Sequence, residues 1–150
     1  MPAKTRIAFL TAVVLVAVSA LAQAPPPGRF VLSLPGQATA LELALPGMQV
    51  NREQSGFQPD GEGVRLFTTG EGGWVVSAFL EKAPQEGDSK TCRRVWWEQA
   101  QKPPLKREQE KLSERGEMAL VEYRVREAQG TQVNQKHTHA YLAGGGVWGE

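Results

Sequence analysis

The hydrophobic pattern of this chain changes its period at one segment, and that change constrains the fold. From Ser89 to Gln101 the apolar side chains, among them Cys92 and Trp96, recur with the 3.6-residue period of a helix. Asp88 or Ser89 can cap the N-terminus of this segment, and the two prolines that follow it end the helix. The sequence therefore predicts one packed helix.

Most of the remaining chain alternates apolar and polar residues with a period of two, which is typical of strands with one buried face. The predicted strands are 30–34, 40–45, 64–68, 74–80, 118–125 and 131–142. Strand 74–80 is apolar on both faces and is expected in the middle of the sheet. The predicted fold class is α+β, an antiparallel β-sheet with one packed helix.

Turns and connections complete this outline. Asn51–Gly63 is polar and aperiodic, which predicts a loop. Leu105–Glu117 is highly charged without an apolar stripe, so we expect a solvated connection. Gln129-Gly130 predicts a tight turn, and the glycines at 144–146 predict another one. That second turn leads into Val147-Trp148, where the sequence resembles a shortened last strand.

The N-terminus has the three parts of a secretory signal peptide. Lys4 and Arg6 precede an apolar run over 7–18, and small residues follow, with a cleavage site after Ala22. The apolar run is shorter than the ~20 residues of a membrane-spanning helix. The predicted organisation is a signal peptide at 1–22, a Pro-rich leader at 23–29 and a single domain at 30–150. We expect a secreted or periplasmic bacterial protein without a transmembrane segment after cleavage.

Charge and cysteine content limit the partners and the chemistry. After cleavage, 15 basic and 16 acidic side chains remain, a net charge of −1, which does not favour a nucleic-acid partner. Segment 90–115 nevertheless carries eight basic and four acidic side chains, and the rest of the mature chain is acidic. The segment can therefore present a basic face to a partner. With Cys92 as the one cysteine, no intramolecular disulfide can form, and the fold depends on packing alone.

Two histidines and the cysteine are the candidates for catalysis or metal binding. His137 and His139 lie two residues apart in a predicted strand, so both point to one face and can share a metal ion. A pair of surface histidines explains the same residues. Cys92 can be a nucleophile with one histidine as its base, or a buried structural thiol on the apolar stripe. Because no catalytic motif is present, we assign no catalytic residue and expect no cofactor.

Arg93, Arg94 and Trp97 are the candidate ligand-binding residues. Two guanidinium groups beside an indole are suited to an anionic ligand that stacks on the ring. The alternative is a solvated helix flank, with Trp96 in the core and Trp97 at its margin.

Three segments together carry a family resemblance. They are C-R-R-V-W-W at 92–97, G-E-M-A-L-V-E-Y at 116–123 and Q-K-H-T-H-A-Y-L at 135–142. Over about residues 74–148 the chain resembles uncharacterised secreted bacterial proteins of the PsbP-like α/β/α sandwich superfamily. The resemblance implies an antiparallel sheet covered by helices and a role in assembly, stability or binding, and it implies no catalytic residue. The family pattern continues beyond Trp148 into more strand.

The function expected from the sequence is an exported non-enzymatic binding or assembly domain with a protein or small-molecule ligand. One alternative is an exported metal-dependent or thiol enzyme that uses His137 and His139. Another is an envelope-surface docking protein that uses the basic face at 90–115. The sequence does not indicate an oligomeric state.

Overall fold

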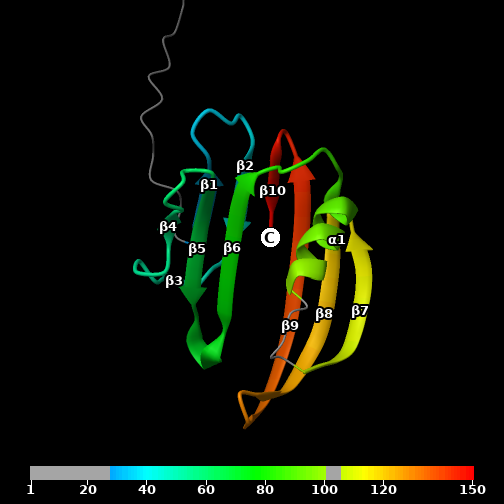
Figure 1. Cartoon of the computed structure of the whole chain (residues 1–150). Coiled ribbons are helices and arrows are strands. Elements are labelled where there is room, and N and C mark those ends of the chain that lie inside the picture. The colour runs from blue at the N-terminus through cyan, green and yellow to red at the C-terminus, as the bar shows by residue number, and fades with distance from the viewer. Residues whose placement is uncertain (1–27, 101–105) are drawn as a thin grey trace, which may run out of the picture.

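The computed structural model describes residues 28–100 and 106–150 (Figure 1). The predicted signal peptide and nearly all of the predicted leader lie outside these residues. The elements are β1 Arg29–Ser33, β2 Ala40–Ala44, β3 Gln49–Val50, β4 Gly56–Phe57, β5 Gly63–Thr69, η1 Glu71–Gly73, β6 Val75–Lys82, α1 Ser89–Ala100, β7 Arg107–Arg115, β8 Met118–Ala128, β9 Thr131–Gly144 and β10 Val147–Gly149.

The described strands form one large antiparallel sheet and one separate hairpin. The large sheet has eight strands in the order β3-β5-β6-β10-β9-β8-β7, with β4 also paired to β5, and β1 pairs with β2 in the hairpin. α1 packs on β8 and β9 (Figure 1), whereas β1 packs against β5 and β6. The molecule is an α+β domain dominated by its sheet.

Two hydrophobic clusters lie on opposite faces of this sheet. The helix-side cluster consists of Cys92, Trp97, Ala119, Val121, Tyr123, Val125, Tyr141 and Trp148. The hairpin-side cluster consists of Leu32, Leu34, Leu66, Ala78, Leu80 and Val147. Val147 and Trp148 are neighbours in β10 and point to opposite faces, as side chains alternate along a strand. β10 therefore contributes to both cores.

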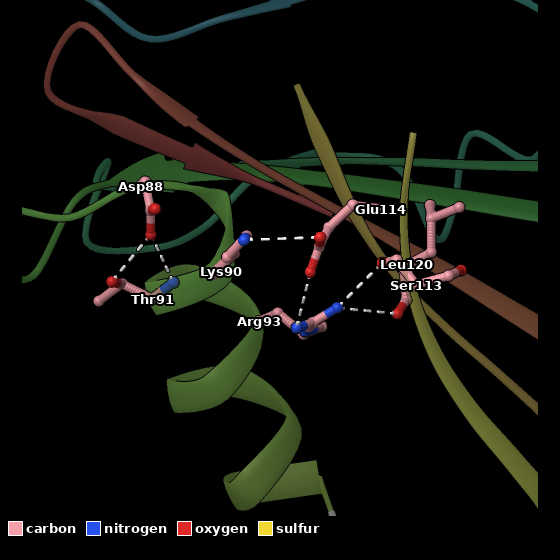
Figure 2. A network of polar contacts seen from close by, with 7 residues as sticks. All are labelled: Asp88, Lys90, Thr91, Arg93, Ser113, Glu114 and Leu120. Atoms are coloured by element: carbon pink, nitrogen blue, oxygen red, sulfur yellow. Dashed lines mark hydrogen bonds and ion pairs between the residues drawn. The ribbon is translucent and has the colours of Figure 1, made fainter. Parts of the chain in front are cut away.

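The predicted helix and strands are confirmed with small shifts at their ends. α1 extends from Ser89 to Ala100, the last described residue before position 106, and the side chain of Asp88 caps its N-terminus. The Oδ1 atom of Asp88 accepts hydrogen bonds from the Thr91 amide at 2.9 Å and the Thr91 hydroxyl at 3.0 Å (Figure 2). β6 lies between β5 and β10, as predicted for the central strand, but Trp74 precedes it and is 72% exposed.

The β8–β9 hairpin also follows the prediction. Its turn consists of Gln129 with φ 51° and Gly130 with φ 77°, two left-handed residues that match the twist of the flanking strands. The loop predicted at 51–63 is largely confirmed, although β4 interrupts it and Gly63 already belongs to β5.

The prediction of a solvated connection at 105–117 is wrong over its described part. Residues 107–115 form β7, which pairs with β8 at the edge of the sheet. Backbone pairing needs no apolar stripe, and the charged side chains find partners around the strand, for example Lys111 opposite Glu122. A bulge between Glu108 and Lys111, with Gln109 at φ 55°, interrupts the pairing near the start of β7.

Within the described ranges, no helix is sufficiently long and apolar to cross a membrane.

The packing of the hairpin on the sheet predicts unequal effects of two neighbouring substitutions. Leu32 is 4% exposed and Val31 is 54% exposed. We expect Leu32→Ala to lower the free energy of unfolding by about 2–5 kcal/mol, because it removes buried methyl groups and leaves a cavity. Val31→Ala is the matched control, with an expected change within about 0.5 kcal/mol. Urea titrations followed by tryptophan fluorescence measure both values, and equal losses would contradict the packing.

Candidate functional site

A cleft of about 460 Å³ lies between α1 and β7. One wall is the flank of α1 and the other is β7, the last strand of the sheet in the part of the chain described. The lining residues are Lys90, Thr91, Arg93, Arg94, Trp97, Glu98, Glu110 and Leu112. The cleft therefore brings together the three residues that the sequence singles out for ligand binding, Arg93, Arg94 and Trp97.

Arg93 fixes α1 to the two strands beside it (Figure 2). Its Nη1 donates to the carbonyl oxygens of Ser113 at 3.0 Å and Leu120 at 3.3 Å, and its Nη2 lies 3.6 Å from a carboxylate oxygen of Glu114. Lys90 approaches the other oxygen of Glu114 at 3.5 Å. The Arg93 side chain is only 13% exposed, so its charge is already used inside the protein, and it forms a fixed wall of the cleft.

Five of the residues that line the cleft are exposed: Lys90, Arg94, Glu98, Glu110 and Leu112. Arg94 is exposed and makes no ion pair with any residue in the described ranges. Leu112 projects from β7 and is 53% exposed, which is unusual for a large aliphatic side chain in a strand. The cleft thus offers an exposed guanidinium group and an apolar side chain, beside the exposed carboxylates of Glu98 and Glu110.

Trp97 forms the floor of the cleft. It is 5% exposed, and its Nε1 donates to Glu110 at 3.2 Å. The Arg107 guanidinium lies 4.6 Å from the centre of its ring, and the Tyr123 ring lies 5.3 Å away. Trp97 therefore supports the site from below, with most of its ring covered by the protein's own side chains.

The alternative that placed Trp97 at the margin of the core is wrong. Trp97 is buried, while Trp96 is half-buried and packs against Phe79, Tyr141 and Trp148. The two indoles diverge because α1 lies between the two sides of the sheet: Trp96 faces β6 and β10, and Trp97 faces β7 and β8. Nε1 of Trp96 donates to Glu81 on β6 at 3.2 Å.

His137 and His139 of β9 lie on the helix side of the sheet, next to Tyr123 of β8. The Tyr123 ring stacks on His137 at 5.0 Å and on His139 at 5.5 Å, and the two imidazoles are 6.4 Å apart. No group of three His, Cys, Asp or Glu side chains within the described residues is arranged to hold a metal ion. Metal binding by this pair stays a prediction, and the described residues supply no third side-chain ligand of this kind for the ion.

His139 belongs to a partly buried chain of hydrogen-bonded side chains that sequence spacing does not reveal. Its Nδ1 hydrogen-bonds to the carboxylate of Glu150, and its Nε2 lies 3.0 Å from the Tyr123 hydroxyl. If Glu150 accepts the Nδ1 proton, Nε2 is left to accept the hydroxyl proton. Glu150 reaches this position because its backbone pairs with Phe79 on β6 at 2.8 and 2.9 Å. Only the sheet register places it there.

Burial raises the pKa values of three groups around these hydrogen-bonded side chains. Burial raises the pKa of Tyr123 and that of Tyr141, so both hydroxyls remain protonated donors. Burial also raises the pKa of the Cys92 thiol to about 12, and Cys92 is completely inaccessible. The thiol is therefore protonated and inaccessible to solvent at neutral pH. These two properties are those expected of a buried structural cysteine.

Two further clefts lie away from His137, His139 and Cys92. One, of about 500 Å³, lies between the β3–β4 loop and β5, beside Phe57 and Arg65. The other, of about 470 Å³, lies at the N-terminal end of α1 beside Glu117 and Gly144. Neither they nor the cleft at α1 and β7 are lined by His137 or His139.

The partly buried His137 predicts a pH dependence of stability. Desolvation, with the nearby charges of His139 and Arg107, lowers the pKa of His137 below its usual 6.5. The unfolded chain therefore binds the proton more readily, and the folded state loses stability as pH falls below about 6.5. We expect His137→Asn to reduce this loss between about pH 7.5 and pH 5.5, measured by urea titration. An unchanged pH dependence would contradict the assignment.

Comparison with known proteins finds no matching family model, no similar curated protein and no similar solved structure.

Proposed function

We propose that the chain is an exported, non-enzymatic domain that binds a protein or small-molecule ligand in the cleft between α1 and β7. One observation carries this proposal: Arg93, Arg94 and Trp97 line the same cleft. Arg93 and Trp97 are held in place by hydrogen bonds, whereas Arg94 is exposed. A rigid site with one free cationic group is preorganised for a ligand.

The chemistry of the cleft suggests a ligand with an anionic group and an apolar part. Arg94 can bind a carboxylate or phosphate with two parallel hydrogen bonds. Leu112 contributes an apolar contact on the opposite wall. Recognition sites commonly combine a largely apolar surface with a few fixed polar groups.

The alternative functions receive less support from the same geometry. An enzyme that uses His137, His139 or Cys92 needs an accessible reactive group, but Cys92 is covered and its thiol has a pKa of about 12. Within the basic segment 90–115, Lys90 and Arg93 both lie beside Glu114, so these two charges are partly compensated. Surface charges that are already paired add little to binding.

The PsbP-like resemblance belongs to this proposal as well. The resemblance implies an antiparallel sheet covered by helices, and the described part of the chain has an antiparallel sheet with one α-helix, on one of its faces. On the opposite face a β-hairpin takes the place where an α/β/α sandwich has a second helical layer. The function that this resemblance implies is a role in binding or assembly.

Substitutions in the cleft test the site. Peptides selected from a random display library on the purified chain are used as ligands, and their affinities are measured by fluorescence anisotropy. We expect Arg94→Glu and Leu112→Ser each to weaken binding by about tenfold or more, which corresponds to about 1.4 kcal/mol. Arg52→Glu, at an exposed arginine in the loop after β3, is the matched control and should leave affinity unchanged. If no peptide binds, or if all three variants bind alike, the site is wrong.

Export is tested independently of the ligand. The full chain is expressed in a bacterium with two membranes, and the mass of the protein in the periplasmic fraction is measured. We expect the mass of residues 23–150, because signal peptidase cuts after small residues such as Ala22. Ala22→Arg should block this cut and leave the longer chain. Uncut wild-type protein confined to the cytoplasm would contradict export.

A further inference from the structure

We infer that the ligand of the cleft is an extended acidic peptide, which pairs as an additional antiparallel strand with the free edge of β7. This inference rests on the proposed binding function and specifies the partner. Three features support it: the open edge of β7, the position of the cleft beside that edge, and the charge around both.

β7 offers a regular template for strand pairing. It ends the order of the sheet, and no strand of the described chain pairs with its outer side (Figure 1). In an antiparallel ladder, every second residue of an edge strand turns its N–H and C=O groups outward. Beyond the bulge, residues 111–115 pair one to one with 118–122 of β8. This regular segment can accept a peptide of similar length.

The cleft lies where one face of an added strand would meet the protein. Neighbouring strands are about 4.8 Å apart, so a peptide on β7 runs directly beside the outer wall of the cleft. Leu112 is opposite Val121, which is buried under α1, so Leu112 lies on the helix side of the sheet. Alternate side chains of the peptide can therefore contact Leu112 and approach Arg94.

The other side chains of the peptide would meet basic groups. Lys111 and Arg115 are one and three residues from Leu112 along β7. Because side chains alternate along a strand, both lie on the face away from α1. The described segments 90–98 and 106–115 contain seven basic and four acidic side chains. This surplus favours an acidic peptide that alternates apolar and acidic residues. Its apolar residues would face Leu112 and its acidic residues would face Lys111 and Arg115, while the exposed Arg94 adds to the positive potential that attracts the peptide. β7 as a whole carries three basic and three acidic side chains, but its regular part, 111–115, has two basic side chains and one acidic one, Glu114, which already lies beside Lys90 and Arg93. A second copy would bring the same positive surplus to this part of the edge.

The test uses a heptapeptide of alternating glutamate and valine, with blocked ends and a fluorescent label, and the whole mature protein. We expect it to bind about tenfold or more tightly than the same peptide with lysine in place of glutamate. Lys111→Glu should weaken binding, and Arg52→Glu is the matched control. Amide hydrogen exchange at 111–115 should slow when the peptide is bound.

Backbone pairing is separated from side-chain contact by N-methylation of the peptide. Methyl groups on one set of alternate residues remove the amides that face β7, which should weaken binding by about tenfold or more, while the other set should have little effect. If both methylated peptides bind like the parent, the strand addition is wrong, although the cleft can still be the binding site. Equal binding of the lysine peptide would overturn the acidic partner.

Two other outcomes also overturn the inference. If the heptapeptide does not bind while display-selected ligands still depend on Arg94 and Leu112, the proposed function stands and the strand addition fails. If residues 111–115 are protected without peptide and the protein elutes as a dimer, a second copy occupies the edge.

Discussion

The short strand β10 holds the two halves of the sheet together. Val147–Gly149 pairs with β6 on one side and β9 on the other, and all three residues are buried. Val147 packs into the hairpin-side cluster, and Trp148 packs into the helix-side cluster against Trp96. Without these pairings the strands before α1 and the strands β7–β9 after it would form separate sheets, and the two hydrophobic clusters would lose the strand that they share.

The cleft at β7 follows from the width of a single helix. A helix is about 10 Å across and strands are about 4.8 Å apart, so one helix covers about two strands. α1 lies over β8 and β9, where its buried Cys92 and Trp97 pack. β7 is the next strand outward and is reached only by long side chains such as Arg93. The space between the helix flank and β7 is therefore a consequence of having one helix on this face.

The sequence predicts those elements in which one face is buried. The helix at 89–100 and the strands of the β8–β9 hairpin have apolar side chains at the period that burial requires. β7 lies at the edge with charged side chains in water on both faces, so its strand pairing leaves no hydrophobic period in the sequence. The same local reasoning expected one tryptophan of α1 to be buried, whereas the broad sheet beneath the helix accommodates both Trp96 and Trp97.

The residues of the candidate site also fall into two groups, those that local sequence patterns predict and those that only the order of the strands brings together. Arg93, Arg94 and Trp97 are predicted because they occupy neighbouring positions on one helix. Leu112, the apolar wall of the cleft, is missed because β7 itself is missed. The contact of His139 with Glu150 is not local either, since it depends on β10 pairing with β6 and β9. Residues that meet through register can be found only when the order of the strands is known.

The composition of β7 bears on whether its open edge serves only to avoid aggregation. Charged side chains and a bulge protect edge strands from pairing with copies of themselves, and β7 has both. Protection alone, however, is achieved by charges of either sign and does not call for an exposed leucine. The bulge lies at one end of β7, and Leu112 lies within the regular segment that follows, with the exposed Arg94 across the cleft. The regular segment 111–115 carries two basic side chains and one acidic one around Leu112, so the charge that opposes pairing with a second copy also makes this part of the edge complementary to an acidic strand.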